Sequence, residues 1–202
     1  MSLFPCRTRS EVVRLLSVRR GHFDLKLGHH GVSCSMLAEI VLRKIILRSP
    51  EEKADLKLSW LRPDEEFFAS GACHVLAAAF LEVYPSAGFS PWSVRPTDGG
   101  RGAHVIVMRG DLVFDWAGYS HRDTFLSEYV EAIRVLIPNW NAELLPIAVN
   151  PISWEFCVAT SSRHPSQFPH DPLPRAMAFV RRFPHPQMPA NATNRPSGPL
   201  RS

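Results

Sequence analysis

The chain has 202 residues, 45% of them hydrophobic and 21% charged, a composition that is typical of a globular domain and argues against a fibrous or wholly disordered protein. The net charge of +4 is unevenly distributed, with +6 on residues 1–50, −7 on residues 51–159 and +5 on residues 160–202. The acidic centre, which has no zinc-finger or aromatic RNA-binding signature, argues against specific nucleic-acid binding. The basic ends are either solubilising flanks or contacts for an acidic partner.

The sequence shows no targeting signal and no metal or redox motif. No apolar run reaches membrane-spanning length, and Met1–Arg7 lacks the apolar core of a secretory signal. We therefore expect a cytoplasmic protein without a transmembrane segment, or one delivered to another cell by a route that needs no such signal. The spacing of the four cysteines fits neither a zinc site nor a redox pair and predicts free thiols: Cys6, Cys34, Cys73 and Cys157. We expect no cofactor.

The region before residue 51 reads as a basic helical segment. Apolar residues at helical spacing predict helices over 10–18 and 35–47, and Ser49 followed by Pro50 predicts the start of another. We expect residues 1–50 to pack on a catalytic core that spans 51–160. Residues 51–68 have no clear periodicity.

The stretch from Ser70 to Pro85 organises the rest of the chain. Residues 75–81 are apolar on all sides, which predicts a helix buried in the middle of the domain and ended by Pro85. Cys73 falls on the first turn, where the N–H groups have no partner within the helix and the dipole favours an anion. A thiol there has its pKa lowered toward the thiolate, so we predict that Cys73 is a nucleophile.

A β-hairpin is predicted from two strands, 103–108 and 112–116. A two-residue turn at 110–111 makes His104 and Asp115 diagonal neighbours on one face, with backbones about 7–8 Å apart. Their side chains would then be within reach of each other.

The remaining elements are predicted from shorter patterns. They are a strand at 92–95, a helix over 123–136, strands at 144–149 and 154–158, and one or two helical turns over 176–183. Because residues 161–202 are rich in Pro, Ser, His and Arg, we expect a Pro-rich basic tail that is largely disordered, above all from residue 184.

Cys73, His104 and Asp115 occur in the order nucleophile, base and orienting carboxylate. An aspartate beside a histidine fixes the ring tautomer and stabilises the imidazolium, which in turn holds a thiolate. His121 is an alternative base within a turn. His74 points about 100° away from Cys73 on a helix, and we expect it to be structural.

This order resembles the papain-like superfamily in its transglutaminase-type arrangement, over about residues 68–120. The resemblance implies an α+β, papain-like fold, in which a helix carrying Cys73 packs on an antiparallel sheet carrying His104 and Asp115. It also implies catalysis through an acyl-thioester, with these residues as nucleophile, base and orienter. Papain's glutamine before the cysteine and tryptophan after it are missing, with Phe67 and His74 in that neighbourhood. A backbone N–H, such as that of Cys73, would then stabilise the oxyanion.

The superfamily includes cysteine peptidases, transglutaminases, arylamine N-acetyltransferases and bacterial glutamine deamidase toxins. We therefore expect a thiol-dependent hydrolase or acyl transferase that acts on a peptide bond or a protein glutamine side chain. A compact domain with basic ends would suit a thiol protease, a deamidase toxin or a translocated effector. The alternative is a non-catalytic papain-like binding module whose basic ends contact acidic partners. A metal hydrolase using His29, His30 and His74 is a third hypothesis, although their spacing matches no known ligand pattern.

Overall fold

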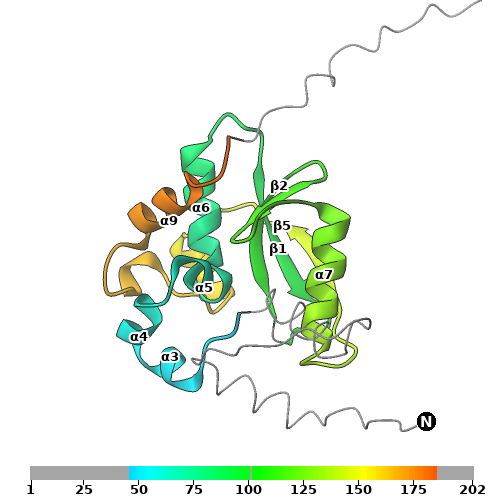
Figure 1. The fold of residues 1–202 in the computed structure, drawn as a ribbon, viewed down its shortest axis with the longest axis horizontal. Helices are drawn as coiled ribbons and strands as arrows, with labels where there is room; N and C mark the ends of the chain where they lie inside the picture. Colours follow the sequence, from blue (N-terminus) through cyan, green and yellow to red (C-terminus); the bar gives the residue numbers. More distant parts are fainter. Residues whose placement is uncertain (1–45, 101, 186–202) are drawn as a thin grey trace, which may run out of the picture. The chain divides into compact units, whose positions relative to one another are not determined.

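The computed structural model describes residues 46–100 and 102–185, which lie in one of the two compact units of the chain, Cys34–Ser202. Their centre is a five-stranded antiparallel sheet with the strand order β4-β3-β2-β1-β5 (Figure 1). The strands are β1 Ser90–Pro96, β2 His104–Arg109, β3 Leu112–Asp115, β4 Gly118–His121 and β5 Ala142–Pro146. Together with the helices, this sheet confirms the predicted α+β class.

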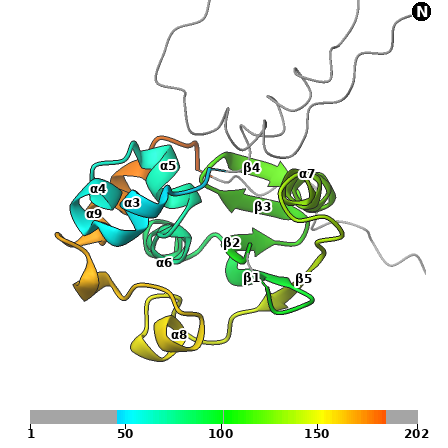
Figure 2. The ribbon, with the colours of Figure 1, turned by 90° about the horizontal axis from the view of Figure 1, so that it is seen from below.

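Helices cover both faces of the sheet (Figure 2). On one face, α6 (Cys73–Val83) packs against β2 and against α9 (Pro172–Val180), and α7 (Arg122–Arg134) lies on the other. Successive side chains of a strand point to opposite faces, so β2 contributes to two hydrophobic clusters. Val105 and Val107 belong to the cluster around α6, and Ile106 and Met108 to the cluster that includes α7 residues.

The helix and hairpin on which the site prediction depends are confirmed. The helix α6 begins at Cys73 and ends at Val83, before Pro85. The hairpin has the predicted register, with Val107 opposite Phe114 and a two-residue turn after Arg109. Gly110 in that turn has a φ of +56°, in the left-handed region that glycine adopts without strain.

The predicted helix start at residue 50 is also confirmed. Helix α3 (Pro50–Ala54) has a capping box, in which the Ser49 hydroxyl accepts from the Glu52 N–H and the Glu52 carboxylate accepts from the Ser49 N–H. Two further short helices, α4 (Leu56–Trp60) and α5 (Asp64–Ala69), occupy the stretch without clear periodicity. The predicted helix over 10–18 and nearly all of that over 35–47 lie outside the described residues.

The strand predicted at 154–158 is wrong, because this segment forms helix α8 (Trp154–Ala159). The Ser153 hydroxyl caps it by accepting a hydrogen bond from the Phe156 N–H. A short apolar run does not distinguish helix from strand by its periodicity, and the cap decides between them here. Strand β4 was not predicted.

The boundary predicted at residue 160 is wrong, because residues 161–185 belong to the folded domain. After the 3₁₀ turn Pro165–Gln167, Asp171 caps α9 by accepting from the Leu173 N–H. Ala176, Phe179 and Val180 are fully buried in the α6 cluster. The disorder predicted from residue 184 concerns mainly residues 186–202, which lie outside the described residues.

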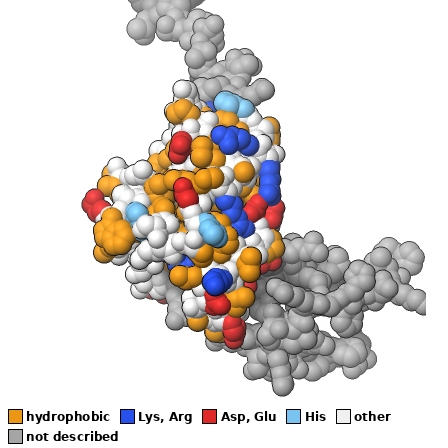
Figure 3. Space-filling view, turned by 90° about the vertical axis from the view of Figure 1, so that its left-hand side faces the viewer, with side chains coloured by type: hydrophobic (Ala, Val, Ile, Leu, Met, Phe, Trp, Pro, Cys, Tyr) orange, Lys and Arg blue, Asp and Glu red, His pale blue; other side chains and the backbone are white. Residues whose placement is uncertain are grey.

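The surface of the described residues carries both signs of charge. On the face shown in Figure 3, hydrophobic, basic and acidic side chains are interspersed. Exposed apolar side chains include those of Leu61, Trp154 and Val158. Within residues 46–100 and 102–185, none of the helices combines the length and the apolar character needed to cross a bilayer.

The packing of α9 predicts that Phe179→Ala lowers the free energy of unfolding by about 3–5 kcal/mol, because it leaves a cavity in the core. Val158→Ala is the control and should change it by less than about 0.5 kcal/mol, because surface substitutions away from packed features have small effects. Urea titration followed by circular dichroism measures both changes. Equal effects of the two substitutions would show that α9 is not part of the core.

Candidate active site

A cavity of about 900 Å³ opens where α6 and β2 begin, and Cys73, His74 and His104 line it. Its volume is within the range of about 300–1,000 Å³ that is usual for small-molecule sites. Part of its wall is apolar and comes from α7, the residues after it and α8: Tyr129, Ile133, Leu136, Ile137 and Phe156. The cavity therefore offers a thiol and two imidazole rings at one place and an apolar surface beside them.

His104 and Asp115 make the contact expected from the hairpin register. The ring Nε2 of His104 lies 3.3 Å from Oδ2 of Asp115, and both side chains are buried. The other carboxylate oxygen, Oδ1, accepts from the Ala117 N–H at 2.8 Å. Because an ionised carboxylate only accepts hydrogen bonds, Nε2 carries a proton, and Nδ1 remains for the thiol.

Two aromatic rings of α7 fix the plane of the His104 ring. Tyr129 stacks on it with centroids 5.5 Å apart and 17° between the planes, and Phe125 lies at 6.4 Å. The Tyr129 hydroxyl donates to the carbonyl of Gly102, two residues before His104. The imidazole is thus held against α7 by stacking and at its edge by Asp115.

Cys73 and His104 meet around the end of the sheet. His104 shares the α7 side of β2 with Ile106, whereas Cys73 belongs to the cluster on the α6 side. Each residue is the first of its element, so the side chains reach each other beyond the end of the strand. The three residues therefore do not share one face of the sheet, because His104 and Asp115 lie on the α7 side and Cys73 on the α6 side.

The surroundings of Cys73 and His104 stabilise the charged form of each side chain and so outweigh the opposite effect of burial. Burial alone would raise the pKa of the Cys73 thiol, but hydrogen bonds with His104 and His74 and the charges of both rings lower it to about 5. Burial alone would lower the pKa of His104, but hydrogen bonds with Asp115 and Cys73 and their negative charges raise it to about 10. At neutral pH the pair is therefore a thiolate and an imidazolium.

The start of α6 adds to this effect. Its N-cap residue, Ala72, has no side chain that could bond the first-turn N–H groups. These groups and the positive end of the helix dipole therefore face the cavity unsatisfied by any cap, an arrangement that favours an anion.

Cys157 is the other thiol in the described part of the chain, and its environment disfavours the thiolate, in contrast to that of Cys73. It is a buried free cysteine, and burial raises its pKa. It therefore behaves as a small apolar side chain. Cys6 and Cys34 lie outside the described residues.

The other histidines have different positions. His74 is buried and its Nε2–H donates to the carbonyl of Arg163 at 2.8 Å, which fits the predicted structural role, although its ring also contacts the Cys73 thiol. His121 caps α7, with Nδ1 accepting from the Asp123 N–H, and is not brought to Cys73 as a base. His29 and His30 lie outside the described residues, and within the described ones no group of three His, Cys, Asp or Glu side chains could hold a metal ion.

Arg48 lies against the turn that leads into α6. A Cβ atom at Gly71 would stand 3.0 Å from the Arg48 Cζ, so only a residue without a side chain allows the guanidinium to approach this closely. Gly71 also has a φ of +115°, which L-residues with side chains rarely adopt. Burial, and after it the charge of Arg62, lower the pKa of Arg48, and the negative charges of Cys73 and Glu52 oppose this in part.

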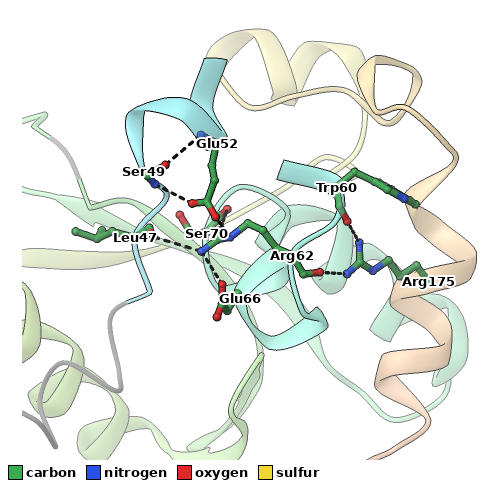
Figure 4. A network of polar contacts seen from close by, with 8 residues as sticks. All are labelled: Leu47, Ser49, Glu52, Trp60, Arg62, Glu66, Ser70 and Arg175. Carbon is green, nitrogen blue, oxygen red and sulfur yellow. Dashed lines mark hydrogen bonds and ion pairs between the residues drawn. The ribbon is translucent and has the colours of Figure 1, made fainter. Parts of the chain in front are cut away.

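A buried arginine holds these segments together (Figure 4). Arg62 donates to the carbonyl of Leu47 at 3.3 Å and to that of Ser70 at 3.5 Å. Glu52 and Glu66 pair with it, each at 3.4 Å. Because its two carbonyl acceptors adjoin Arg48 and Gly71, Arg62 positions the segment carrying Arg48 against the turn before Cys73.

The sequence prediction did not include Arg48, Arg163 or Tyr129 in the site. Tyr129 and Phe125 are four residues apart on the predicted apolar face of a helix, a pattern that indicates core packing and gives no sign of stacking on histidine. Arg48 and Arg163 stand in segments without a recognisable motif. Their places depend on tertiary contacts.

No family model matches this chain, and neither a curated protein nor a solved structure is significantly similar to it. Its chemistry is therefore inferred from the geometry of the site.

We predict that Cys73 is alkylated by iodoacetamide with a half-maximal rate near pH 5, because the thiolate forms as the pH rises through its pKa. Cys157 should react only at much higher pH, because burial raises its pKa. Peptide mass spectrometry after timed labelling resolves the individual cysteines.

In His104→Asn the imidazolium is absent, and the midpoint for Cys73 should move up toward or beyond the ordinary thiol value of about 8.5. His121→Asn is the matched control, because asparagine retains the cap of α7, and it should keep the wild-type profile. The ion pair would be contradicted if the alkylation rates of Cys73 and Cys157 had the same pH dependence, or if the pH dependence of Cys73 were the same in His104→Asn as in the wild type.

Proposed function

We propose that the protein is a thiol-dependent hydrolase or acyl transferase that acts on an amide, either a peptide bond or a protein glutamine side chain. The observation that carries this proposal is the thiolate of Cys73 beside the imidazolium of His104, with Asp115 on the far ring nitrogen. A nucleophile, a base within reach of it and a third group that orients the base are the parts of nucleophilic catalysis.

In the first half-reaction, Sγ of Cys73 attacks the amide carbonyl carbon and forms a C–S bond. His104 is already protonated and gives its proton to the leaving nitrogen as the C–N bond breaks. An amine leaves from a peptide bond, and ammonia leaves from a glutamine side chain. The acyl group remains on Cys73 as a thioester.

In the second half-reaction, water or an acceptor amine attacks the thioester and His104 takes its proton. Water gives a carboxylic acid, and an amine gives a new amide. The C–S bond breaks, and the thiolate leaves beside the imidazolium, which restores the starting pair. Asp115 accepts the hydrogen bond of the Nε2–H throughout, so that Nδ1 exchanges the proton.

The start of α6 is suited to stabilise the oxyanion. The tetrahedral intermediate carries its charge on the former carbonyl oxygen, close to the attacking sulfur. We assign this role to the backbone N–H of Cys73, because it belongs to the residue that carries the sulfur and Ala72 provides no side-chain cap that would compete for the first-turn N–H groups. This donor takes the part of the glutamine that papain uses.

The arrangement of the elements supports a papain-like protein of the transglutaminase type. A cysteine opens a buried helix, a histidine opens a strand, and an aspartate ends the next strand of an antiparallel sheet. Such chemistry would suit a peptidase, a deamidase or a delivered effector.

The test is an incubation of the protein with a mixture of glutamine-containing peptides. Released ammonia reports deamidation, new N-termini report cleavage, and the intact mass of the protein reports an acyl group on Cys73. Cys73→Ser should abolish all three signals. His104→Asn should lower the rate by a factor of about 10²–10⁴, the usual contribution of a general acid–base group. Asp115→Asn should be milder, because Tyr129 still holds the ring.

The matched control is Cys157→Ala, which removes the other described thiol and should leave the activity unchanged. Full activity of Cys73→Ser would place the nucleophile elsewhere. If no amide is turned over while Cys73 still reacts as a thiolate, the result favours the alternative hypothesis of a non-catalytic binding module.

A further inference from the structure

The wall of the cavity beside Cys73 is cationic. Arg48, Lys53 and Arg163 line it, and within the described residues no aspartate or glutamate does. An active site that cleaves a neutral amide does not need additional positive charge on its wall, because Cys73 and His104 supply the charges of the reaction. The excess of positive charge therefore suggests that the substrate carries an anionic group.

Arg48 has no carboxylate partner among the described residues. Its Nε atom is buried without a hydrogen-bond partner, and the guanidinium lies against Gly71, in the turn that leads to Cys73. Glu52, whose charge also acts on Arg48, is paired with Arg62. A partly buried guanidinium without an anion is costly, and an anion bound next to it would offset that cost.

Arg163 brings a second cation to the same wall. Its carbonyl accepts the hydrogen bond of His74, the neighbour of Cys73, so its backbone is fixed near the nucleophile. Its guanidinium lies 5.3 Å from the centre of the Phe168 ring and makes no ion pair within the described residues. Burial lowers the pKa of Arg163, and the charge of Arg48 lowers it further, as expected for two nearby cations that share no anion.

We infer that Arg48 and Arg163 form an anion-binding subsite beside Cys73, and that the substrate is an amide with a carboxylate or phosphate close to the reacting carbonyl. This inference rests on the proposed function, because it names the substrate class of the same site. Arginine suits this role because its planar donors match the oxygens of carboxylate and phosphate groups. Arg62, which holds the segment of Arg48 against the turn, is a positioning residue for the subsite.

The test compares two alkylating reagents of nearly the same shape, the anion iodoacetate and the neutral iodoacetamide. The ratio of their rates at Cys73 should fall by about tenfold or more in Arg48→Gln and in Arg163→Gln, because a charge-assisted contact to the reagent carboxylate is lost. The rate with iodoacetamide should stay near that of the wild type, which also shows that each variant is folded and keeps its thiolate.

Arg95→Gln is the matched control, because Arg95 is exposed on β1 and does not line the cavity, and the substitution changes the net charge by the same amount. Its ratio should equal that of the wild type. An unchanged ratio in both cavity variants would overturn the inference. A fall in Arg48→Gln alone would assign the anion to Arg48 and overturn the part given to Arg163.

A second measurement distinguishes the two kinds of anion. Glutarate, inorganic phosphate and the neutral glutaramide are each added before iodoacetamide, and protection of Cys73 is measured in the wild type and in Arg48→Gln. Protection by glutarate indicates a carboxylate, and protection by phosphate indicates a phosphate group. No protection by either anion, or equal protection by glutaramide, would overturn the subsite.

The two proposals fail in different ways. Slow alkylation of Cys73 by iodoacetamide at neutral pH would contradict the thiolate and with it the proposed function. Fast alkylation by iodoacetamide without any preference for iodoacetate would leave the thiolate in place and remove the anion subsite.

Discussion

The contact between His104 and Asp115 is the interaction on which the rest of the site depends. Burial opposes charge on both Cys73 and His104, and this effect is overcome by the contact between the two side chains together with those to Asp115 and His74. The carboxylate of Asp115 adds a second anion to the ring and is itself held by the Ala117 N–H. Without it, the imidazolium would be balanced by the thiolate alone, and a proton transfer to give a neutral thiol and a neutral imidazole would be easier.

This contact depends in turn on one hairpin. The two-residue turn at Gly110 sets the pairing of β2 with β3, and the pairing makes His104 and Asp115 diagonal neighbours. A shift of one residue would turn Asp115 to the α6 side of the sheet, away from the ring. The hydrophobic alternation of β2 opposes such a shift, because it would exchange the residues that pack on α6 with those that pack toward α7. The buried core thus fixes the register that the chemistry needs.

The parts of the site that follow from local rules could be predicted from the sequence, and the parts that follow from tertiary packing could not. The buried helix, the hairpin register and the meeting of His104 with Asp115 follow from periodicity and from turn geometry. The stacking of Tyr129 on His104 depends on where α7 lies, which no local pattern specifies. The prediction of a disordered tail is wrong for residues 161–185 because proline, taken as a sign of disorder, here begins α9, and proline suits the first turn of a helix, which Asp171 caps. Which side chains of α9 are buried becomes clear only from the packing of this helix against α6.

In the proposed function, the reacting groups and the anion-binding subsite come from different parts of the chain. The thiol, the ring and the carboxylate lie on α6, β2 and β3, a continuous unit, whereas Arg48 precedes this unit and Arg163 follows it. Arg175 of α9 ties these outer parts together by donating to the carbonyls of Trp60 and Arg62 (Figure 4). Because Arg62 in turn holds the segments of Arg48 and Gly71, the C-terminal helix supports the cationic wall from a distance. The cations therefore keep their places without a carboxylate partner among the described residues, which leaves their charge available to the anionic group of the proposed substrate.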